Sequence, residues 1–387
     1  MLNFLKGLVY DLVLILAITG RRKKNTTPKA LIVRTDEIGD FVLWQSFIAE
    51  MVQCNLLQNY AVDFVGNTSV RTLFNLQAKN YFSNSIWLHK NAFKTNMFYR
   101  YKFLRKIYLE RYDIVINPIY SRAKRIDDSI IKAAKAKNTY GMYRNKQNYA
   151  SYEQLYDFRL YKHLMPEMQK PVFEFYRNKA FTEFVTGKTS EIFKPTFPIN
   201  IIHSDVTSRI YHDYFVIFPG SRHEKRIWPT ENFVEVSNYL YERFNWMAIV
   251  CGSRNDLHYS RSFVKQYNHP LKDLTNKTTL PELLLVLKNA KCLISVDTGS
   301  IHLAALVNST TFGVFNGSQY GRFAPYPETI SNNIVAVYPH TIDDAIQKND
   351  VRIMKKLEYV VNIPYADVTA IKMITTIKKF FDTHPPH

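Results

Sequence analysis

Short runs of apolar and β-branched residues alternate with stretches of helical periodicity along most of this chain. Three such runs in the first half are residues 30–34, 61–65 and 113–117. Each run has the length of a buried strand, and strands that alternate with helices are typical of parallel sheets covered by helices. The sequence therefore predicts an α/β protein.

A second series of strand-like runs follows residues 188–198, where the pattern lapses into Lys, Thr and Pro. The runs are residues 214–218, 246–250, 292–296 and 310–315. A chain of 387 residues suits two or three domains, since one domain takes roughly 100–200 residues. We expect an N-terminal domain over residues 28–200 and a C-terminal domain over 201–387, with a terminal helix at 367–381.

The first residues of the chain carry a membrane signal. Residues 2–18 are mostly apolar, and four basic residues follow at 21–24. The segment is short for a span, and Asp11 near its middle would cost about 2.5–3.5 kcal/mol inside a bilayer. A cleaved signal peptide would carry its basic residues ahead of the apolar stretch. We expect residues 1–27 to form a helix and basic linker on an anionic membrane surface, the alternatives being a helix packed on the protein and a single span.

The charge balance is strongly positive. Lys and Arg number 51 against 33 Asp and Glu, a formal net charge of +18 that attracts phosphates, anionic lipid or nucleic acid. No RNA-recognition motif, zinc-finger spacing or basic region leading into heptads is present, so we expect no nucleic-acid partner.

The cysteines and the paired acidic residues give no metal signal. The three cysteines are far apart in the sequence and fit a reducing compartment. The adjacent pairs Asp127-Asp128 and Asp343-Asp344 are interpreted as helix surface, and we expect neither a metal nor a cofactor.

Three strand-to-helix loops carry the chemistry. The first runs from Arg34 to Asp40, ahead of a helix expected over 41–53. Gly39 would let the backbone approach a ligand closely, and Asp40 would point from the loop as a candidate base. Alternatively, Asp40 simply caps the helix.

The other two loops are suited to phosphate. Residues 218–229 place basic and titratable side chains before a helix that begins at Thr230, and Trp228 is expected to pack that loop onto its domain. Residues 295–302 pass from a strand through small residues into a helix, whose N-terminal amides bind phosphate readily.

The order and spacing of these loops resemble those of the family 9 glycosyltransferases, which include the ADP-heptose:lipopolysaccharide heptosyltransferases. The matching segments are ALIVRTDEIGDFVL, FVIFPGSRHEKRIWPTENF, CLISVDTGSIHLAAL and GVFNGSQYGRFAPY, within residues 30–326. The resemblance implies a GT-B architecture: two Rossmann-like domains with parallel sheets that face a central cleft. The first domain would hold the acceptor and the second the nucleotide sugar.

The resemblance also implies roles for residues. Asp40 would be the catalytic base, with Asp36 as the fallback and Gly39 and Gly220 in loops near the active site. Lys225 and Arg226 are both candidates for the donor phosphate, because Ile227 separates them from the Trp-Pro pair. The other donor-binding candidates are Ser221, Asp256, Asp297, Thr298, Gly299, Ser300 and His302. Asp256 would accept from the ribose hydroxyls, and the backbone amides, the basic side chain and His302 would stabilise the leaving diphosphate without a metal.

Together these features predict an inverting glycosyltransferase. It would move a heptose or related sugar from a nucleotide-diphosphate donor, ADP-heptose first, to a lipid-linked lipopolysaccharide core acceptor. It would work in the cytoplasm, on the inner face of the cytoplasmic membrane. The alternatives are a non-catalytic glycolipid-binding scaffold of the same fold and a basic nucleic-acid-binding protein.

Overall fold

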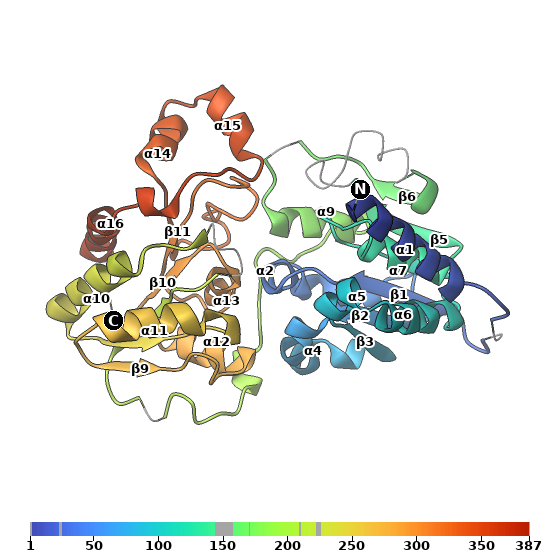
Figure 1. Cartoon of the computed structure of the whole chain (residues 1–387), viewed down its shortest axis with the longest axis horizontal. Coiled ribbons are helices and arrows are strands. Elements are labelled where there is room, and N and C mark those ends of the chain that lie inside the picture. Colours follow the sequence, from blue (N-terminus) through green and yellow to red (C-terminus); the bar gives the residue numbers. More distant parts are fainter. Residues whose placement is uncertain are drawn as a thin grey trace. The chain divides into compact units, whose positions relative to one another are not determined.

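The computed structural model describes residues 2–22, 25–143, 158–169, 171–208, 210–221 and 226–386, without the side chains of residues 2–5. The chain divides into two compact units (Figure 1). Unit 1 consists of Met1–Gln169 and Tyr176–Ile192, and unit 2 of Lys170–Phe175 and Phe193–His387. Residues 170–175 and 193–200, which the sequence placed in the first domain, thus lie with the second unit.

Within the described residues, unit 1 is built on one six-stranded parallel sheet with the order β3-β2-β1-β4-β5-β6. Its strands are β1 (Lys29–Arg34), β2 (Ala61–Asn67), β3 (Asn84–Leu88), β4 (Ile114–Ile116), β5 (Asn138–Met142) and β6 (His163–Met165). Its helices are α1 (Leu2–Ala17), α2 (Ile38–Val42), α3 (Ile48–Val52), α4 (Arg71–Gln77), α5 (Lys90–Thr95), α6 (Met97–Leu109), α7 (Asp127–Ala134) and α9 (Glu174–Thr186), the last beginning in unit 2. The central strand β1 is buried over its last five residues, as its apolar run requires.

Unit 2 repeats this plan with the order β12-β11-β10-β7-β8-β9, again parallel throughout the described strands. Its strands are β7 (Tyr214–Phe218), β8 (Met247–Val250), β9 (Leu271–Asp273), β10 (Leu293–Val296), β11 (Thr311–Val314) and β12 (Ile334–Val337). Its helices are α10 (Thr230–Phe244), α11 (Leu257–Gln266), α12 (Leu280–Lys288), α13 (Gly299–Leu306), α14 (His340–Gln347), α15 (Val351–Leu357) and α16 (Ala370–Thr383). The seven strand-like runs named from the sequence correspond to β1, β2, β4, β7, β8, β10 and β11, and the expected helices at Thr230 and near the C-terminus are present.

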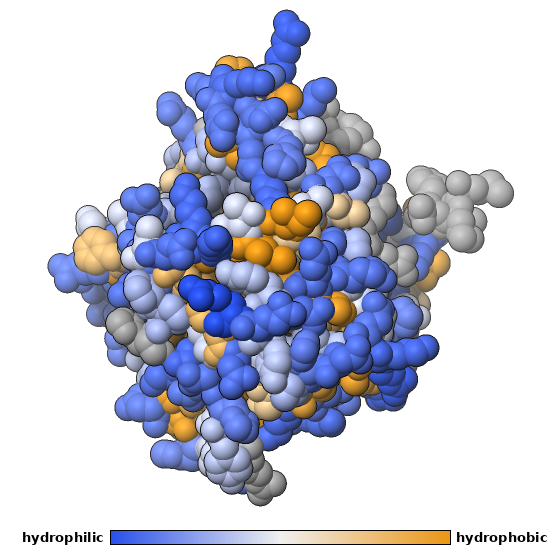
Figure 2. All heavy atoms as spheres, turned by 90° about the vertical axis from the view of Figure 1, so that its left-hand side faces the viewer, coloured by the Kyte–Doolittle hydropathy of each residue, from blue (hydrophilic) through white to orange (hydrophobic). Residues whose placement is uncertain are grey.

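The N-terminal helix α1 packs on unit 1. Leu14 and Ala17 are buried in the same core as Phe103 and Leu104 of α6, and α6 is the main neighbour of α1 (Figure 1). In the described part of the chain, no helix combines the length and the apolar character that crossing a membrane requires. The face in Figure 2, the side of Figure 1 that carries α10 and α16, is mostly hydrophilic, with hydrophobic residues in small groups.

The core of unit 2 includes Trp228, the residue expected to pack its loop onto the domain. Its side chain is buried against Phe233 of α10 at a ring distance of 4.8 Å, and its indole Nε1 donates to the Val368 carbonyl at 2.6 Å. This prediction is confirmed, and the bond ties the loop after β7 to the segment before α16.

Replacing Trp228 should therefore destabilise unit 2 in two steps. Trp228→Phe leaves the buried Val368 carbonyl without its donor and should cost about 1–3 kcal/mol of unfolding free energy. Trp228→Ala adds a cavity and should cost roughly 3–5 kcal/mol. Urea unfolding followed by circular dichroism checks both values, and Ile371→Ala, at an α16 side chain that is 70% exposed, is the control. Equal stability of Trp228→Phe and wild type would contradict the bond.

Candidate active site

The strand order of each sheet reverses at one position, between β1 and β4 in unit 1 and between β7 and β10 in unit 2. Open α/β sheets bind their ligands outside the carboxyl ends of the strands at this switch point. The loops after β1 and β4, and those after β7 and β10, are therefore the places where a site can form. The three loops named from the sequence follow β1, β7 and β10.

The loop after β1 is shorter than expected. Glu37 is the N-cap, and α2 begins at Ile38, so Asp40 lies in the first helical turn and is not the cap. The expected single helix over 41–53 is also wrong, because α2 ends at Val42 and α3 begins only at Ile48. Between them the chain forms a tighter 3₁₀ turn with Trp44 completely buried. Gly39 is buried, whereas the Asp40 side chain stays half-buried at the positive end of the helix.

A buried arginine fastens this loop. The Arg34 Nη2 donates to the Asp40 carbonyl at 2.8 Å, and Nε lies 3.0 Å from Asp36 Oδ1 in an ion pair. The Arg34 side chain is fully buried. The Asn67 amide, at the end of β2, donates to the Asp36 carbonyl at 3.0 Å and fixes the loop from the other side.

The two candidate bases on this loop differ in their surroundings. Burial raises the pKa of Asp36 well above its usual range, and the charges of Asp40 and Asp127 raise it further while Arg34 opposes them. The Asp36 carboxylate is also paired with the Arg34 guanidinium inside the protein, whereas the Asp40 side chain is half-buried and open to a substrate hydroxyl. The arrangement favours Asp40 over Asp36 as the base.

The Asp127-Asp128 pair is not the helix surface that the sequence suggested. Both residues are buried at the start of α7, after β4. Asp127 accepts from the Thr35 hydroxyl and from the Ala123 amide, and Asp128 lies 3.3 Å from Arg122 in an ion pair. Tertiary contacts explain the burial: Asp127 meets Thr35 of the loop after β1, and Asp128 also accepts from the Tyr161 hydroxyl at 3.1 Å.

In unit 2 the loop after β10 leads directly into α13. Thr298 is the N-cap, and its hydroxyl lies 2.7 Å from that of Ser300, which in turn lies 2.8 Å from Ser295 Oγ. The first amides of a helix have no earlier carbonyl of that helix to bond, so those of Gly299 and Ser300 have no partner within α13. Thr298 and Gly299 are half-buried and therefore reachable from solvent.

Arg226 and Asp297 meet beside this helix start. The Arg226 Nη1 lies 3.0 Å from Asp297 Oδ2 and donates to the Asp297 carbonyl at 3.3 Å. The loops after β7 and β10 are thereby joined, and the Arg226 side chain remains 26% exposed. Asp297 thus orients a cation near the first turn of α13. Lys225, the other candidate, lies outside the described residues, as do residues 222–224.

Asp256 and Gly220 lie against each other. The Asp256 Oδ2 accepts from the Ser253 amide at 2.7 Å and from its hydroxyl at 2.6 Å, which forms a capping box for the short helix after β8. A Cβ atom on Gly220 would lie only 2.1 Å from Asp256 Oδ1, so this close approach requires glycine. Ser221 follows and is half-buried. The structure thus gives Asp256 a structural role at its Oδ2 atom.

His302 lies one turn into α13, where it is buried. Its Nδ1 is 2.5 Å from the Tyr326 hydroxyl, and its ring packs against Phe323. Burial lowers the pKa of His302 to about 4, with Glu174 opposing the shift. At neutral pH the ring is therefore uncharged, and if Tyr326 donates to Nδ1 the proton of the ring is on Nε2.

The residues around His302 come from a motif to which the sequence had given no role. Tyr326 and Arg322 belong to the GVFNGSQYGRFAPY segment, and Arg322 Nε bonds Glu174 Oε2 at 2.8 Å. Phe173 packs its ring on Tyr326 at 4.9 Å. The aromatic residues of this motif could have marked it as part of the site. Its partners Phe173 and Glu174 are about 150 residues distant in sequence, so these contacts could not be inferred.

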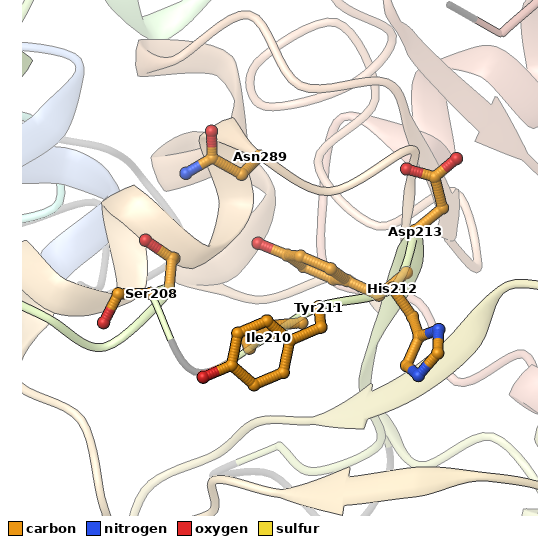
Figure 3. Close-up of a pocket in the computed structure, with 8 residues that line it drawn as sticks. Ser208, Ile210, Tyr211, His212, Asp213 and Asn289 are labelled. Atoms are coloured by element: carbon orange, nitrogen blue, oxygen red, sulfur yellow. The ribbon is translucent and has the colours of Figure 1, made fainter.

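A hollow of about 440 Å³ in unit 2 lies at the opposite edge of the sheet (Figure 3). Tyr211, His212 and Asp213 line it on the segment that leads into β7, and Asn289 lines it from the end of α12. It therefore opens at the amino end of the strands, away from the switch point. Within the part of the chain that the structure describes, no three His, Cys, Asp or Glu side chains are grouped as metal ligands.

Comparison with known proteins decides the family. The family model described as glycosyltransferase family 9 (heptosyltransferase) matches residues 100–350, which is more than half of the chain. The chain belongs to glycosyltransferase family 9. Two curated relatives, both named lipopolysaccharide heptosyltransferase 3, come from Escherichia coli. The K12 protein is 29% identical over 119 residues, which cover 30% of this chain and 35% of the relative. The second is 27% identical over 160 residues, 41% of this chain and 45% of the relative, so less than half of either relative is matched.

Solved structures of the family have the same fold. The family 9 glycosyltransferase of Veillonella parvula DSM 2008 matches with a TM-score of 0.67 at 14% identity, over 92% of this chain and 97% of that chain. The E. coli heptosyltransferase WaaC with ADP-2-deoxy-2-fluoro heptose matches with a TM-score of 0.63 at 16% identity, over 92% and 99%. The predicted α/β class with two parallel-sheet domains is confirmed.

The neutral His302 of this family 9 protein makes folding depend on pH. An unfolded-chain histidine takes up a proton as the pH falls through about 6.5, whereas folded His302 does so only near 4. The folded state should therefore lose up to about 1.4 kcal/mol per pH unit across this range, and His302→Gln should remove that loss. Urea unfolding at pH 6.5 and pH 5 should show wild type losing roughly 1.5 kcal/mol more than the variant. Identical pH dependence of both proteins would mean that His302 is not held neutral.

Proposed function

We propose that this protein transfers a heptose or related sugar from a nucleotide-diphosphate donor, ADP-heptose, to a lipopolysaccharide core acceptor. The observation that carries the proposal is the joined pair Arg226–Asp297 beside the amides of Gly299 and Ser300. A cation and unpaired helix amides at a switch point suit a diphosphate. The names of the E. coli relatives, and the ADP-heptose analogue in the WaaC structure, support the choice of sugar and acceptor.

The donor is held by unit 2 in this proposal. The Gly299 and Ser300 amides and Arg226 bind the diphosphate, with the Thr298 and Ser221 hydroxyls as further donors and Asp297 orienting the guanidinium. His302 contributes an Nε2 proton from a neutral ring, so it donates a hydrogen bond and supplies no charge. Asp256 reaches the ribose hydroxyls only through Oδ1, because Oδ2 is held by Ser253.

The base is supplied by unit 1. The Asp40 carboxylate takes the proton of an acceptor hydroxyl as its oxygen attacks the anomeric carbon. The new C–O bond forms while the bond from that carbon to the diphosphate oxygen breaks, so the configuration inverts and the nucleoside diphosphate leaves. The fixed donors on unit 2 stabilise the charge that develops on the leaving oxygen, the task a metal would otherwise perform.

Asp40→Asn should test this reaction most simply, because asparagine keeps the size of the side chain but cannot take the proton. Single-turnover transfer from a panel of nucleotide sugars to truncated core glycolipids, in EDTA, should proceed with wild type and fall by at least ~10² in the variant. Loss of wild-type transfer in EDTA would contradict metal independence. Glycolipid binding without transfer from any donor would favour the non-catalytic scaffold instead.

We further propose that the enzyme works on the inner face of the cytoplasmic membrane, held there by α1. The helix exposes an apolar strip of Leu8, Val9, Leu12, Ile15 and Leu16, each 45–57% exposed. Leu8, Leu12 and Ile15 recur at positions i, i+4 and i+7, so they lie on one face of the helix. A lipid bilayer can cover this strip without the helix having to span it.

The opposite face of α1 is fastened to unit 1. The Tyr10 hydroxyl donates to the Lys94 carbonyl at 2.5 Å, and Arg105 donates to the Ala17 carbonyl at 3.2 Å. Asp11, which would oppose insertion, is itself exposed, and its charge acts on Lys132 of α7. The basic residues after the helix, Arg21 and Arg22 among them, match anionic headgroups at about 1 kcal/mol each.

The double variant Leu12→Gln, Ile15→Gln should weaken vesicle binding at least ~10-fold, because each buried side chain contributes about 1.5–3 kcal/mol. Co-sedimentation with phosphatidylglycerol vesicles measures the effect, and Ile371→Gln on α16 is the matched exposed control. Binding should be weaker to pure phosphatidylcholine vesicles. Unchanged binding of the double variant would exclude the strip as the contact.

A further inference from the structure

The buried guanidinium of Arg34 contacts both candidate bases, Asp40 through its backbone carbonyl and Asp36 through its carboxylate. Arg34 is the last residue of β1, its side chain is fully buried, and its guanidinium lies at the carboxyl edge of the sheet. Nη2 donates to the Asp40 carbonyl at 2.8 Å, and Nε pairs with the Asp36 carboxylate at 3.0 Å. Arg34 is neither one of the residues proposed to bind the nucleotide sugar nor the proposed catalytic base.

The same guanidinium reaches two further elements of unit 1. Nη1 donates to the Pro118 carbonyl, directly after β4, at 2.7 Å and to Asn178 Oδ1 on α9 at 3.0 Å. Asn178 Nδ2 in turn donates to the Leu43 carbonyl, at the end of α2, at 3.1 Å. The two Nη atoms of Arg34 thus hold three acceptors in fixed directions, which a single ammonium group cannot, while Nε contributes only the ion pair with Asp36. Both ends of the short helix α2 are thus tied to the switch point.

Other charged groups surround the loop. Asp127 faces it from α7, and Lys90 of α5 bonds Glu37 Oε1 at 2.8 Å. Lys90 also acts electrostatically on Asp36. Several carboxylates therefore lie in or beside this loop. The protonation of each carboxylate depends on its distance from the positive charges of Arg34 and Lys90.

We propose that Arg34 is a positioning residue for sugar transfer: its Nη atoms fix the backbone at Asp40 and its charge is paired with Asp36, so that Asp40 is the group that takes the acceptor proton. The inference rests on the proposed function, because it assigns Arg34 through Asp40. It explains why a fully buried charge ends a strand whose other buried residues are apolar. Burying an arginine costs desolvation free energy, and an apolar residue could replace it if its only role were to fill space.

Two variants separate the geometry of the Arg34 guanidinium from its positive charge. Arg34→Lys keeps the charge without the planar group, and Arg34→Ala removes both. Both should lower kcat by about 10²-fold, the effect expected of an attacking group displaced by about 1 Å, with the KM of donor and acceptor changed less than about threefold. The acidic limb of the pH–rate profile should move to higher pH in Arg34→Ala only, because the loop carboxylates then lose a neighbouring cation. Millimolar guanidinium should restore part of the kcat of Arg34→Ala, whereas the same concentration of sodium chloride should not.

Arg100→Ala is the matched control. Arg100 of α6 is equally buried and donates to the Arg125 carbonyl at 2.8 Å and to Ser129 Oγ at 2.9 Å, on α7 and the segment before it. Its loss should lower the melting temperature and leave kcat within about twofold of wild type. Equal losses of kcat in Arg34→Ala and Arg100→Ala, or a change in KM alone, would overturn the positioning role.

The failure of this inference differs from failure of the proposed function. If Asp40→Asn loses transfer while both Arg34 variants keep it, Asp40 is the base but Arg34 does not position it. If Asp40→Asn transfers sugar at the wild-type rate, the base is wrong, and the role of Arg34 through Asp40 is wrong with it.

Discussion

The strands of both described sheets run parallel, and this constraint fixes where the polar loops of the protein lie. A parallel pair needs a crossover helix, so each strand leaves its sheet at the same edge and the next helix begins there. The reversal of strand order then opens one position per sheet where two such loops diverge. Asp40 and Asp127 follow the strands at one reversal, and Arg226 and Asp297 follow those at the other. The chemistry proposed for this family 9 protein depends on that placement more than on any one side chain.

Charge in the interior follows a second rule, that a buried ion needs a partner. The net charge of +18 suggests a surface that attracts anions, yet several of the arginines nearest the switch points are bound to the protein itself. Arg34 and Arg122 hold carboxylates and carbonyls in unit 1, and Arg226 holds Asp297 in unit 2. Arg226 alone of these three keeps an exposed fraction large enough to meet a ligand directly. The others act by fixing loops.

Much of the fold could be predicted from the sequence, because buried parallel strands must be apolar runs. The strands β1, β7 and β10 are such runs, and the glycines and small residues after them marked the loops. The prediction of a helix over 41–53 was wrong. Hydrophobic periodicity alone could not show that Trp44 is completely buried and that a 3₁₀ turn follows it. The burial of Asp127 and Asp128 was missed because their partners Thr35 and Tyr161 come from other parts of the chain.

The central claim is that the start of α13 in unit 2 holds a nucleoside diphosphate. A crystal structure of the protein with ADP bound tests it most directly. The account predicts the diphosphate within hydrogen-bond distance of the Gly299 and Ser300 amides, with Arg226 on its charged oxygens. Density for ADP in the hollow beside Tyr211, at the opposite edge of the sheet, would contradict the account, as would binding of ADP to unit 1 alone.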